Sequence, residues 1–360
     1  MSIRPKASIL NPELLRPSSL NSVARNPELI WLDKNENLDP LLSASNHNIL
    51  LSMPAFSLYT YPEAGDLYRK LAKWTGVSSD SFILTPGSDG AIRLVFDAFV
   101  EVGDSVVHTF PTFAMYPVYS QIFGAKVHMI HYERKKNVPH LNIQELLEVI
   151  GMKKPKLVCL PNPDSPTGTV ISPDVLKTVL SACESAGSVL LIDEAYHPFY
   201  QWSAVKWTEK SKNLIVARTF AKAWGVAGLR IGYAIAHPDT VSLLHKIRPM
   251  YETSTLAVDY ISLLLDHSSE MEESVERINA GKKFFEKEML LMGFTISPAL
   301  GNFSHVNFGE YGPVIHAALK NKVLYRPSFD HPSLIGFSRF SVAPEAIMTK
   351  VVNWIKESLK

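Results

Sequence analysis

Short apolar runs rich in branched side chains alternate with helical patterns between residues 105 and 236, and this alternation constrains the fold more than any other feature of the sequence. An order of strand, helix and strand is typical of a mostly parallel sheet that is covered by helices. We therefore predict an α/β fold with helices on both faces of the sheet. The runs predicted as strands are 105–110, 126–130, 156–160, 188–193, 213–218 and 230–236.

The pattern changes after about residue 245. A long helical segment at 270–292 precedes short extended pieces around 303–308 and 337–342, and a terminal helix is predicted from Pro344. We interpret this part as a smaller α+β domain. The expected division is an N-terminal arm at 1–35, a large domain at 36–245 and a small C-terminal domain at 246–360.

The composition excludes several classes of function. The chain has 36 Lys and Arg residues against 35 Asp and Glu, so it lacks the basic field that binds nucleic acid or an anionic membrane. The N-terminus has no apolar signal core, and no run is apolar for the roughly 20 residues that a membrane span needs. We expect a cytoplasmic protein whose partners are small molecules.

Cysteine and histidine usage gives no sign of a metal site. We expect Cys159 and Cys183 to be buried and inert, without a disulfide. No pair of histidines has ligand spacing beside a carboxylate on a clear helix face, so the histidines are interpreted as ordinary residues.

Polar side chains follow the ends of two neighbouring predicted strands. Asp193 ends one strand and is followed by Tyr196, while Thr219 and Lys222 follow the next strand along the chain. A third strand, 156–160, runs into the loop P-N-P-D-S-P-T-G. Because ligands of doubly wound sheets bind at the carboxyl ends of the strands, we expect these side chains to share one crevice.

The surroundings of Lys222 indicate a reactive amine. A lone lysine is usually a solvated surface residue, but this one closes an apolar strand and precedes Arg230 by eight residues. Desolvation lowers a lysine pKa and creates a Schiff-base nucleophile. A carboxylate at Asp193 would need a cation such as a protonated ring nitrogen, and Tyr196 could bond a ring hydroxyl. The alternative is an aspartate that caps a loop and a tyrosine that packs beside it.

A glycine turn at 85–90, T-P-G-S-D-G, lies where an apolar run meets an amphipathic helix. The backbone amides of 88–90 would then face an anion such as a phosphate. Alone, such a turn is also an ordinary helix cap. Thr219 and Arg230 strengthen the phosphate interpretation, because they add a hydroxyl and a guanidinium.

Together, these segments resemble the fold-type-I pyridoxal-5′-phosphate (PLP) aminotransferases, and most closely the histidinol-phosphate aminotransferase branch. The resemblance extends from about Trp31 to the C-terminus, and the order and spacing of the motifs are specific. The motifs are L-D-K-N-E-N (32–37), Y-P-E (61–63), T-P-G-S-D-G (85–90), F-P-T-F-A-M-Y (110–116), P-N-P-D-S-P-T-G (161–168), D-E-A-Y (193–196), the segment 219–233, N-F (302–303) and S-R-F-S-V (338–342).

The resemblance implies roles in binding PLP. Lys222 matches the Schiff-base lysine, Asp193 the partner of the pyridine nitrogen, and Tyr196 a residue near the ring hydroxyl. Phe113 matches the aromatic side chain that stacks on the ring. The positions around the cofactor phosphate are matched by Ser88, Asp89, Gly90, Thr219 and Arg230, with Tyr61 reaching the phosphate of the neighbouring subunit of a homodimer.

The resemblance also implies a substrate pocket. Arg339 matches the arginine that grips the substrate carboxylate, Asn35 lies in a strand that lines the pocket, and Tyr251 is the best pocket candidate from the start of the small domain. Two positions depart from the family. Ser165 stands where an asparagine bonds the ring hydroxyl, and Ala221 stands where a serine usually bonds the phosphate.

The expected activity is transamination between a small amine donor and a keto acid acceptor such as 2-oxoglutarate, with Lys222 as the general base. Whether the donor is phosphorylated is open. One alternative is a PLP decarboxylase similar to threonine-phosphate decarboxylase. Another is a non-catalytic PLP-sensing module, which the absence of a DNA-binding domain before residue 31 disfavours.

Overall fold

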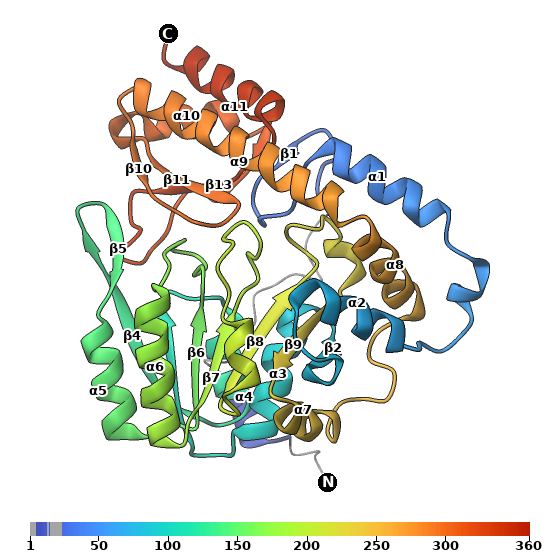
Figure 1. Cartoon of the computed structure of the whole chain (residues 1–360). Coiled ribbons are helices and arrows are strands. Elements are labelled where there is room, and N and C mark those ends of the chain that lie inside the picture. The colour runs from blue at the N-terminus through green and yellow to red at the C-terminus, as the bar shows by residue number, and fades with distance from the viewer. Residues whose placement is uncertain (1–4, 13, 15–23) are drawn as a thin grey trace.

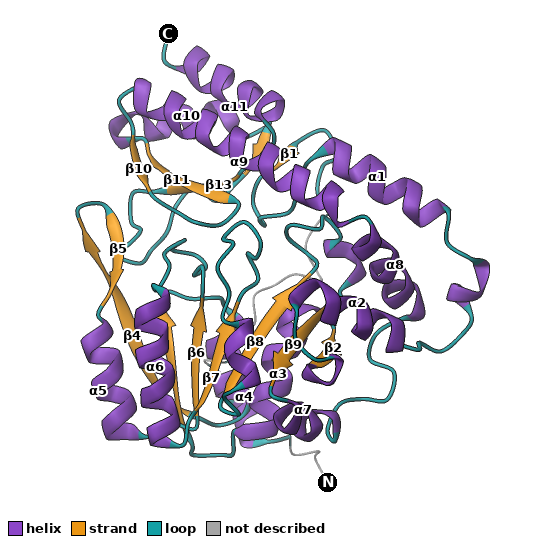
Figure 2. Ribbon diagram, viewed as in Figure 1, coloured by secondary structure: helices purple, strands orange, loops and turns teal. Residues whose placement is uncertain are grey.

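The computed structural model describes residues 5–12, 14 and 24–360, and an eight-stranded sheet forms its centre (Figures 1 and 2). In spatial order, the strands are β2 (Phe82–Thr85), β9 (Gly232–Ala236), β8 (Leu214–Thr219), β7 (Val189–Asp193), β6 (Leu157–Pro161), β3 (Ser105–Phe110), β4 (Lys126–Lys135) and β5 (Val138–Leu141). The five strands from β8 to β4 run parallel to their neighbours. Strand β9 runs antiparallel to β8 and β2, and β5 to β4, which confirms a mostly parallel sheet.

The central strands are continuous apolar runs because helices cover both faces of the sheet. Every residue of β6, β7 and β8 is buried. Successive residues of a strand point to opposite faces, so Val158 and Leu160 enter one core cluster, while Leu157 and Cys159 enter the other.

Each face of the sheet has its own set of helices. One core contains side chains of α3 (Gly87–Phe99), α4 (Met115–Ile122) and α7 (Pro238–His245). The opposite core contains side chains of α2 (Gly65–Thr75), α5 (Ile143–Lys153), α6 (Pro173–Ala186) and α8 (Thr255–Asp266). Helix α6 begins and ends where the sequence predicts, with Pro173 in its first turn and Gly187 in the left-handed region at φ 70°. Cys159 and Cys183 are buried and unpaired, as predicted.

A small antiparallel sheet of β10 (Thr295–Ser297), β11 (Phe303–Asn307) and β13 (Ser338–Ser341) lies above the carboxyl ends of the large sheet (Figure 1). Helices α9 (Ser268–Leu291), α10 (Gly312–Leu319) and α11 (Glu345–Ser358) pack on its outer face in a third core cluster. The structure thus has the smaller C-terminal α+β part that the sequence predicts.

The N-terminal segment joins this small C-terminal part. Strand β1 (Ile30–Trp31) pairs in parallel with β12 (Val323–Leu324), and helix α1 (Pro40–Leu51) follows. Part of the predicted arm at 1–35 lies outside the described residues, and the three domain boundaries stay a prediction. Short 3-10 helices lie at Ala7–Leu10, Ala55–Leu58, Ser79–Ser81, Val205–Glu209, Ala227–Leu229 and Gly309–Tyr311.

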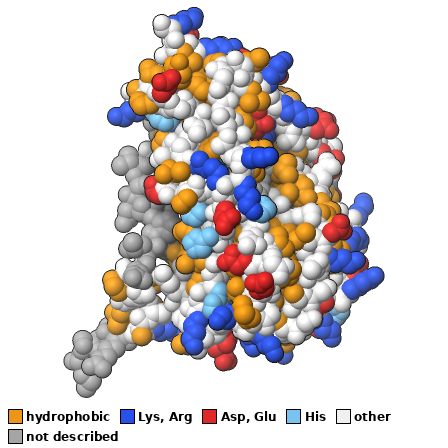
Figure 3. Space-filling model, turned by 90° about the vertical axis from the view of Figure 1, so that its left-hand side faces the viewer, with side chains coloured by type: hydrophobic (Ala, Val, Ile, Leu, Met, Phe, Trp, Pro, Cys, Tyr) orange, Lys and Arg blue, Asp and Glu red, His pale blue; other side chains and the backbone are white. Residues whose placement is uncertain are grey.

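The surface is electrostatically mixed. Basic and acidic side chains are interspersed over the face that Figure 3 shows, in keeping with a net charge of +1. None of the helices in the described part of the chain combines the length and the apolar character that a bilayer crossing requires.

Candidate active site

The predicted site residues of the large sheet meet at the carboxyl ends of β7 and β8. Strand β7 ends at Asp193 and β8 at Thr219, and Lys222 follows three residues later. Strand β9 packs directly against the start of α3. A Cβ atom added to Gly232 would lie only 2.8 Å from the backbone nitrogen of Ser88. Only glycine allows this approach, which places the glycine turn beside the other two strand ends.

Lys222 is held as a partly buried amine. Its Nζ donates a hydrogen bond to the backbone oxygen of Lys34 at 2.6 Å and lies 5.9 Å from the centre of the Tyr196 ring. Burial, and then the positive charge of Arg339, lower the pKa of Lys222 to about 8. At pH 7 roughly a tenth of this amine is therefore unprotonated, far more than for an ordinary lysine, and a nucleophile or base requires that form.

Asp193 is a buried carboxylate with few donors. It accepts hydrogen bonds from the backbone N–H of Ala195 at 3.0 Å and from the Tyr116 hydroxyl at 3.4 Å. Burial raises the pKa of Asp193 to about 7. A protonated ring nitrogen at this carboxylate would supply the missing positive charge and lower that pKa again. Phe113 lies nearby and packs edge-on against Tyr116, with ring centres 6.2 Å apart.

Tyr196 connects the large sheet to the N-terminal segment. Its hydroxyl accepts a hydrogen bond from Asn35 Nδ2 at 2.8 Å and interacts with the Ser165 hydroxyl. Asn35 itself has φ 56° and is held by Ser341 Oγ, which accepts from its backbone N–H at 2.8 Å, and by Asn302 Nδ2, which donates to its carbonyl at 3.0 Å. Burial raises the pKa of Tyr196, so its phenol is a neutral hydrogen-bonding group.

The start of α3 forms a cradle for an anion. Gly87 has φ 75°, and a Cβ atom there would lie 3.0 Å from the nearest guanidinium nitrogen of Arg230. The guanidinium therefore lies over the first turn of the helix, where Ser88, Asp89 and Gly90 follow. Free backbone N–H groups and a guanidinium together suit a phosphate.

Thr219 and Asp89 lie at the edges of this cradle. Thr219 Oγ1 accepts a hydrogen bond from the backbone N–H of Ala221 at 3.1 Å, which leaves the Thr219 hydroxyl proton free to donate. Asp89 accepts a hydrogen bond from the Tyr119 hydroxyl at 2.9 Å. The side chain of Ala221 has no donor, so Thr219 is the remaining hydroxyl from this strand end. The residues present thus fit PLP, with a lysine, a carboxylate and a phosphate cradle in one place.

Arg339 enters the site from β13. It donates a hydrogen bond to the backbone oxygen of Asp33 at 2.9 Å and lies over the Phe303 ring at 5.5 Å. Its Nε has no partner among the described residues, and burial lowers the pKa of Arg339. A buried guanidinium with a free donor is prepared to bind an anionic group of a substrate.

Arg326 is a neighbour of Arg339 that the sequence analysis did not single out. Its backbone pairs with that of Arg339 through hydrogen bonds of 3.0 and 2.8 Å, and the charge of Arg326 contributes to the lowered pKa of Arg339. Its one signal in the sequence is that it follows the short apolar run 323–325. The Arg326 guanidinium lies over the Phe329 ring at 4.2 Å, and the charge of Asp330 acts on it. Two guanidinium groups are thus neighbours at this end of the site.

Tyr61 and Tyr251 lie elsewhere on the surface. Their rings stack on one another with centres 4.2 Å apart, and their exposed fractions are 72% and 51%. Each ring therefore has the other as its neighbour, and the contacts of the described residues join neither ring to Lys222. The predicted role of Tyr61 requires a second subunit. That role and the predicted place of Tyr251 in the substrate pocket stay predictions.

The comparisons with known proteins agree with this geometry. The family described as "Aminotransferase class I and II" matches residues 27–355. The histidinol-phosphate aminotransferase of Caldanaerobacter subterraneus subsp. tengcongensis is 31% identical over 304 residues, which cover 84% of this chain and 85% of that protein. The enzyme of the same name from Thermoanaerobacter sp. (strain X514) is 32% identical over 305 residues, with 84% and 85% covered.

Solved structures show the same fold. The histidinol-phosphate aminotransferase of Sinorhizobium meliloti in complex with PLP has a TM-score of 0.80 at 22% identity, covering 100% of this chain and 98% of that one. This chain belongs to the class I and II aminotransferase family, within its histidinol-phosphate aminotransferase branch. It is a PLP-dependent transaminase of fold type I, and the sequence-based expectations of fold, cofactor and reaction class are confirmed.

Proposed function

We propose that the enzyme transfers the amino group of a small phosphorylated amine to a keto acid, with Lys222 as the catalytic residue. Bound PLP supplies an electron-accepting ring that stabilises negative charge at the substrate carbon. Lys222, Asp193 and the cradle at the start of α3 would hold its aldehyde, ring nitrogen and phosphate, respectively. The low pKa of Lys222 supports this assignment, because the amine must be unprotonated to attack.

The residues of the chain then control the proton. With PLP bound, the Lys222 amine would take a proton from the substrate carbon that bears the nitrogen. Asp193 would keep the ring nitrogen of PLP protonated and would itself stay ionised beside that positive charge. Tyr196, which accepts a hydrogen bond from Asn35, would donate its own hydroxyl proton to an oxygen of the cofactor ring.

The paired arginines carry the proposal about the substrate. Arg326 and Arg339 place two positive charges at the far end of the site, where a monoanionic carboxylate needs only one. A phosphate ester carries about two negative charges and matches both. The relatives named for histidinol phosphate support this substrate class. For the acceptor, 2-oxoglutarate, Arg339 would bind the carboxylate next to the keto group.

We predict that Arg326→Gln separates phosphorylated from unphosphorylated donors. The value of kcat/KM for histidinol phosphate should fall roughly 10- to 100-fold, because a charged hydrogen bond to the phosphate is lost. The value for unphosphorylated histidinol should change less than threefold by the same reasoning. Steady-state kinetics with both donors measure this. Equal losses for both donors would contradict a phosphate role for Arg326.

Decarboxylation is the second candidate reaction. The L-threonine-O-3-phosphate decarboxylase of Porphyromonas gingivalis has a TM-score of 0.75 at 18% identity, which shows a shared fold and no more. The curated relatives at 31% and 32% identity are aminotransferases. Transamination is therefore the reaction that we propose for the phosphorylated donor.

We further propose a cytoplasmic homodimer that shares its active sites. The Tyr61–Tyr251 stack joins two surface segments whose apolar side chains are unusually exposed. These side chains are Phe56, Leu58, Tyr59, Tyr61, Met250 and Tyr251. A contiguous apolar patch of this kind is typical of a subunit interface. Two free, buried cysteines are compatible with the reducing cytoplasm.

The shared site predicts complementation between variants. Lys222→Ala and Tyr61→Phe homodimers should each have low activity, and a mixture that exchanges subunits should regain activity because one hybrid site has both residues intact. Analytical ultracentrifugation and activity after exchange measure the two parts. A monomeric protein, or no recovery despite demonstrated exchange, would contradict the proposal.

A further inference from the structure

A buried ion pair lies directly behind the two strand ends of the candidate active site. Arg218 and Glu194 approach to 2.9 Å, and their side chains are 6% and 2% exposed. Glu194 directly follows Asp193 at the end of β7. Arg218 directly precedes Thr219 at the end of β8. Because successive residues of a strand point to opposite faces, the ion pair lies on the α2 and α6 face, while the two site residues face α3 and α4.

Glu194 holds the turn that presents Tyr196. Its backbone N–H donates to the Ala217 oxygen of β8 at 2.8 Å, and its own backbone oxygen accepts from the N–H of His197 at 2.9 Å. The carboxylate closes the loop 194–204, since it accepts hydrogen bonds from the Ser203 hydroxyl at 2.8 Å and from the backbone N–H of the following residue at 2.7 Å. Tyr196 therefore lies in a turn that Glu194 holds from both sides.

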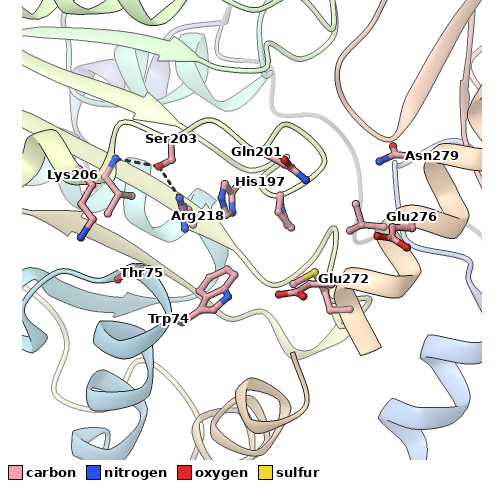
Figure 4. Close-up of a pocket in the computed structure, with 14 residues that line it drawn as sticks. Trp74, Thr75, His197, Gln201, Ser203, Lys206, Arg218, Glu272, Glu276 and Asn279 are labelled. Atoms are coloured by element: carbon pink, nitrogen blue, oxygen red, sulfur yellow. Dashed lines mark hydrogen bonds between the residues drawn. The ribbon is translucent and has the colours of Figure 1, made fainter. Parts of the chain in front are cut away.

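Arg218 is itself fixed in direction. Its Nε and one terminal nitrogen donate to Glu194 at 3.0 and 2.9 Å, and the same terminal nitrogen donates to the Ser203 hydroxyl at 2.7 Å. Figure 4 shows Arg218 between Ser203 and Trp74, whose ring centre lies 5.7 Å from the guanidinium carbon. Burial alone would lower the pKa of Arg218, but the Glu194 carboxylate raises it above its ordinary value. The guanidinium is therefore a charged, planar group held in one orientation.

We propose that Arg218 and Glu194 form a positioning pair for the transamination site. The ion pair fixes the end of β7 to the end of β8, and so fixes Asp193 relative to Thr219 and Lys222. Neither member of the pair contacts these three side chains among the interactions of the described residues. Removing two charges from water costs free energy, so a buried ion pair is weak evidence of stabilisation, and its role here is geometric. The proposal rests on the proposed places of Asp193 and Thr219 at the cofactor.

Arg218→Met combined with Glu194→Gln separates positioning from stability. The double substitution leaves no unpaired charge in the core, which is what makes single substitutions in such a pair destabilising. The amide oxygen at position 194 can still accept from Ser203, and the cavity of about 430 Å³ beside Arg218 gives the shorter side chain room to pack. The melting temperature of the cofactor-free protein should therefore stay within about 5 °C of the wild type.

The same double variant should bind and use PLP poorly. Its dissociation constant for PLP, from absorption titration of the cofactor-free protein, should rise about tenfold, and the visible circular dichroism of bound PLP should weaken because the ring is held less firmly. The value of kcat should fall roughly 10- to 100-fold, as expected when reacting groups are slightly misplaced. The KM of the donor should change less than about threefold, because Arg339 enters from β13.

Two controls accompany the double variant. Glu288→Gln with Lys356→Met removes an ion pair between α9 and α11 and should leave PLP affinity and kcat unchanged. Asp193→Asn, measured in parallel, tests the assumed site by itself. No effect of Asp193→Asn would overturn the site assignment and the proposal with it. A loss in Asp193→Asn, together with wild-type PLP affinity and kcat in the folded double variant, would overturn the positioning pair alone.

Arg218→Lys decides the matter if the double variant does not fold. It keeps the positive charge but loses the planar, two-pronged contact with Glu194, so kcat should fall at least about threefold and the dichroism of bound PLP should weaken. Wild-type kcat and dichroism in Arg218→Lys would then overturn the proposal.

Discussion

Lys222→Ala should abolish the covalent attachment of PLP and lower kcat by at least about 10³-fold, because one side chain serves as both nucleophile and general base. The wild-type enzyme, reduced with borohydride and digested, should carry the cofactor adduct on Lys222. The variant should carry none while its far-UV circular dichroism is unchanged, because the amine makes one hydrogen bond within the described part of the chain, to the Lys34 carbonyl.

Lys210 offers a matched control for this substitution. It is exposed and precedes the amino end of β8, whereas the candidate site lies at the carboxyl end of that strand. Lys210→Ala should keep both the adduct and the activity. An adduct on any lysine other than Lys222 in the wild-type enzyme would contradict the assignment.

Asp193→Asn should lower kcat by roughly 10² to 10³-fold, the range found when a single preorganised electrostatic group is removed. An amide cannot keep the ring nitrogen of PLP protonated, so the carbanion at the substrate carbon is stabilised less. The change should appear mainly in kcat. Steady-state kinetics, with Asp239→Asn as a control at an exposed ion pair, measure the effect.

The same substitution should have the opposite effect on the stability of the cofactor-free protein. Burial raises the pKa of Asp193 from 3.8 to about 7, so the folded state binds a proton more tightly than the unfolded state does. This contribution to stability is full below about pH 4 and is lost as the pH rises through 7. The free energy of unfolding of Asp193→Asn, relative to that of the wild type, should therefore be higher at pH 8 than at pH 4. Urea titrations at the two pH values measure this difference. The same relative stability at both pH values would show that the buried charge of Asp193 does not destabilise the cofactor-free protein.

The strands and their ends could be predicted because local pattern determines them. The runs that form β6, β7 and β8 are apolar at every position, and polar residues begin where the strands end, so Asp193, Thr219 and Lys222 fall at one edge of the sheet. The start of α3 at Gly87 was visible for the same reason, since a glycine turn separates an apolar run from an amphipathic helix.

Contacts between distant segments could not be predicted in this way. The pairing of β1 with β12 and the bond from Asn35 to Tyr196 join residues that no local periodicity relates. Arg326 is near a two-residue strand that is too short to give a pattern, and it lies beside Arg339 because the two backbones pair. The stack of Tyr61 on Tyr251 likewise depends on how two loops pack.

A single turnover with histidinol phosphate and no keto acid tests the central claim most directly. The proposed transaminase should convert its PLP into a stoichiometric amount of pyridoxamine phosphate and stop, and adding 2-oxoglutarate should restore PLP and release glutamate. O-Phosphothreonine, tested in parallel, should release no carbon dioxide above the background of the Lys222→Ala variant. Sustained release of carbon dioxide from phosphothreonine, or no pyridoxamine phosphate from histidinol phosphate, would contradict the account.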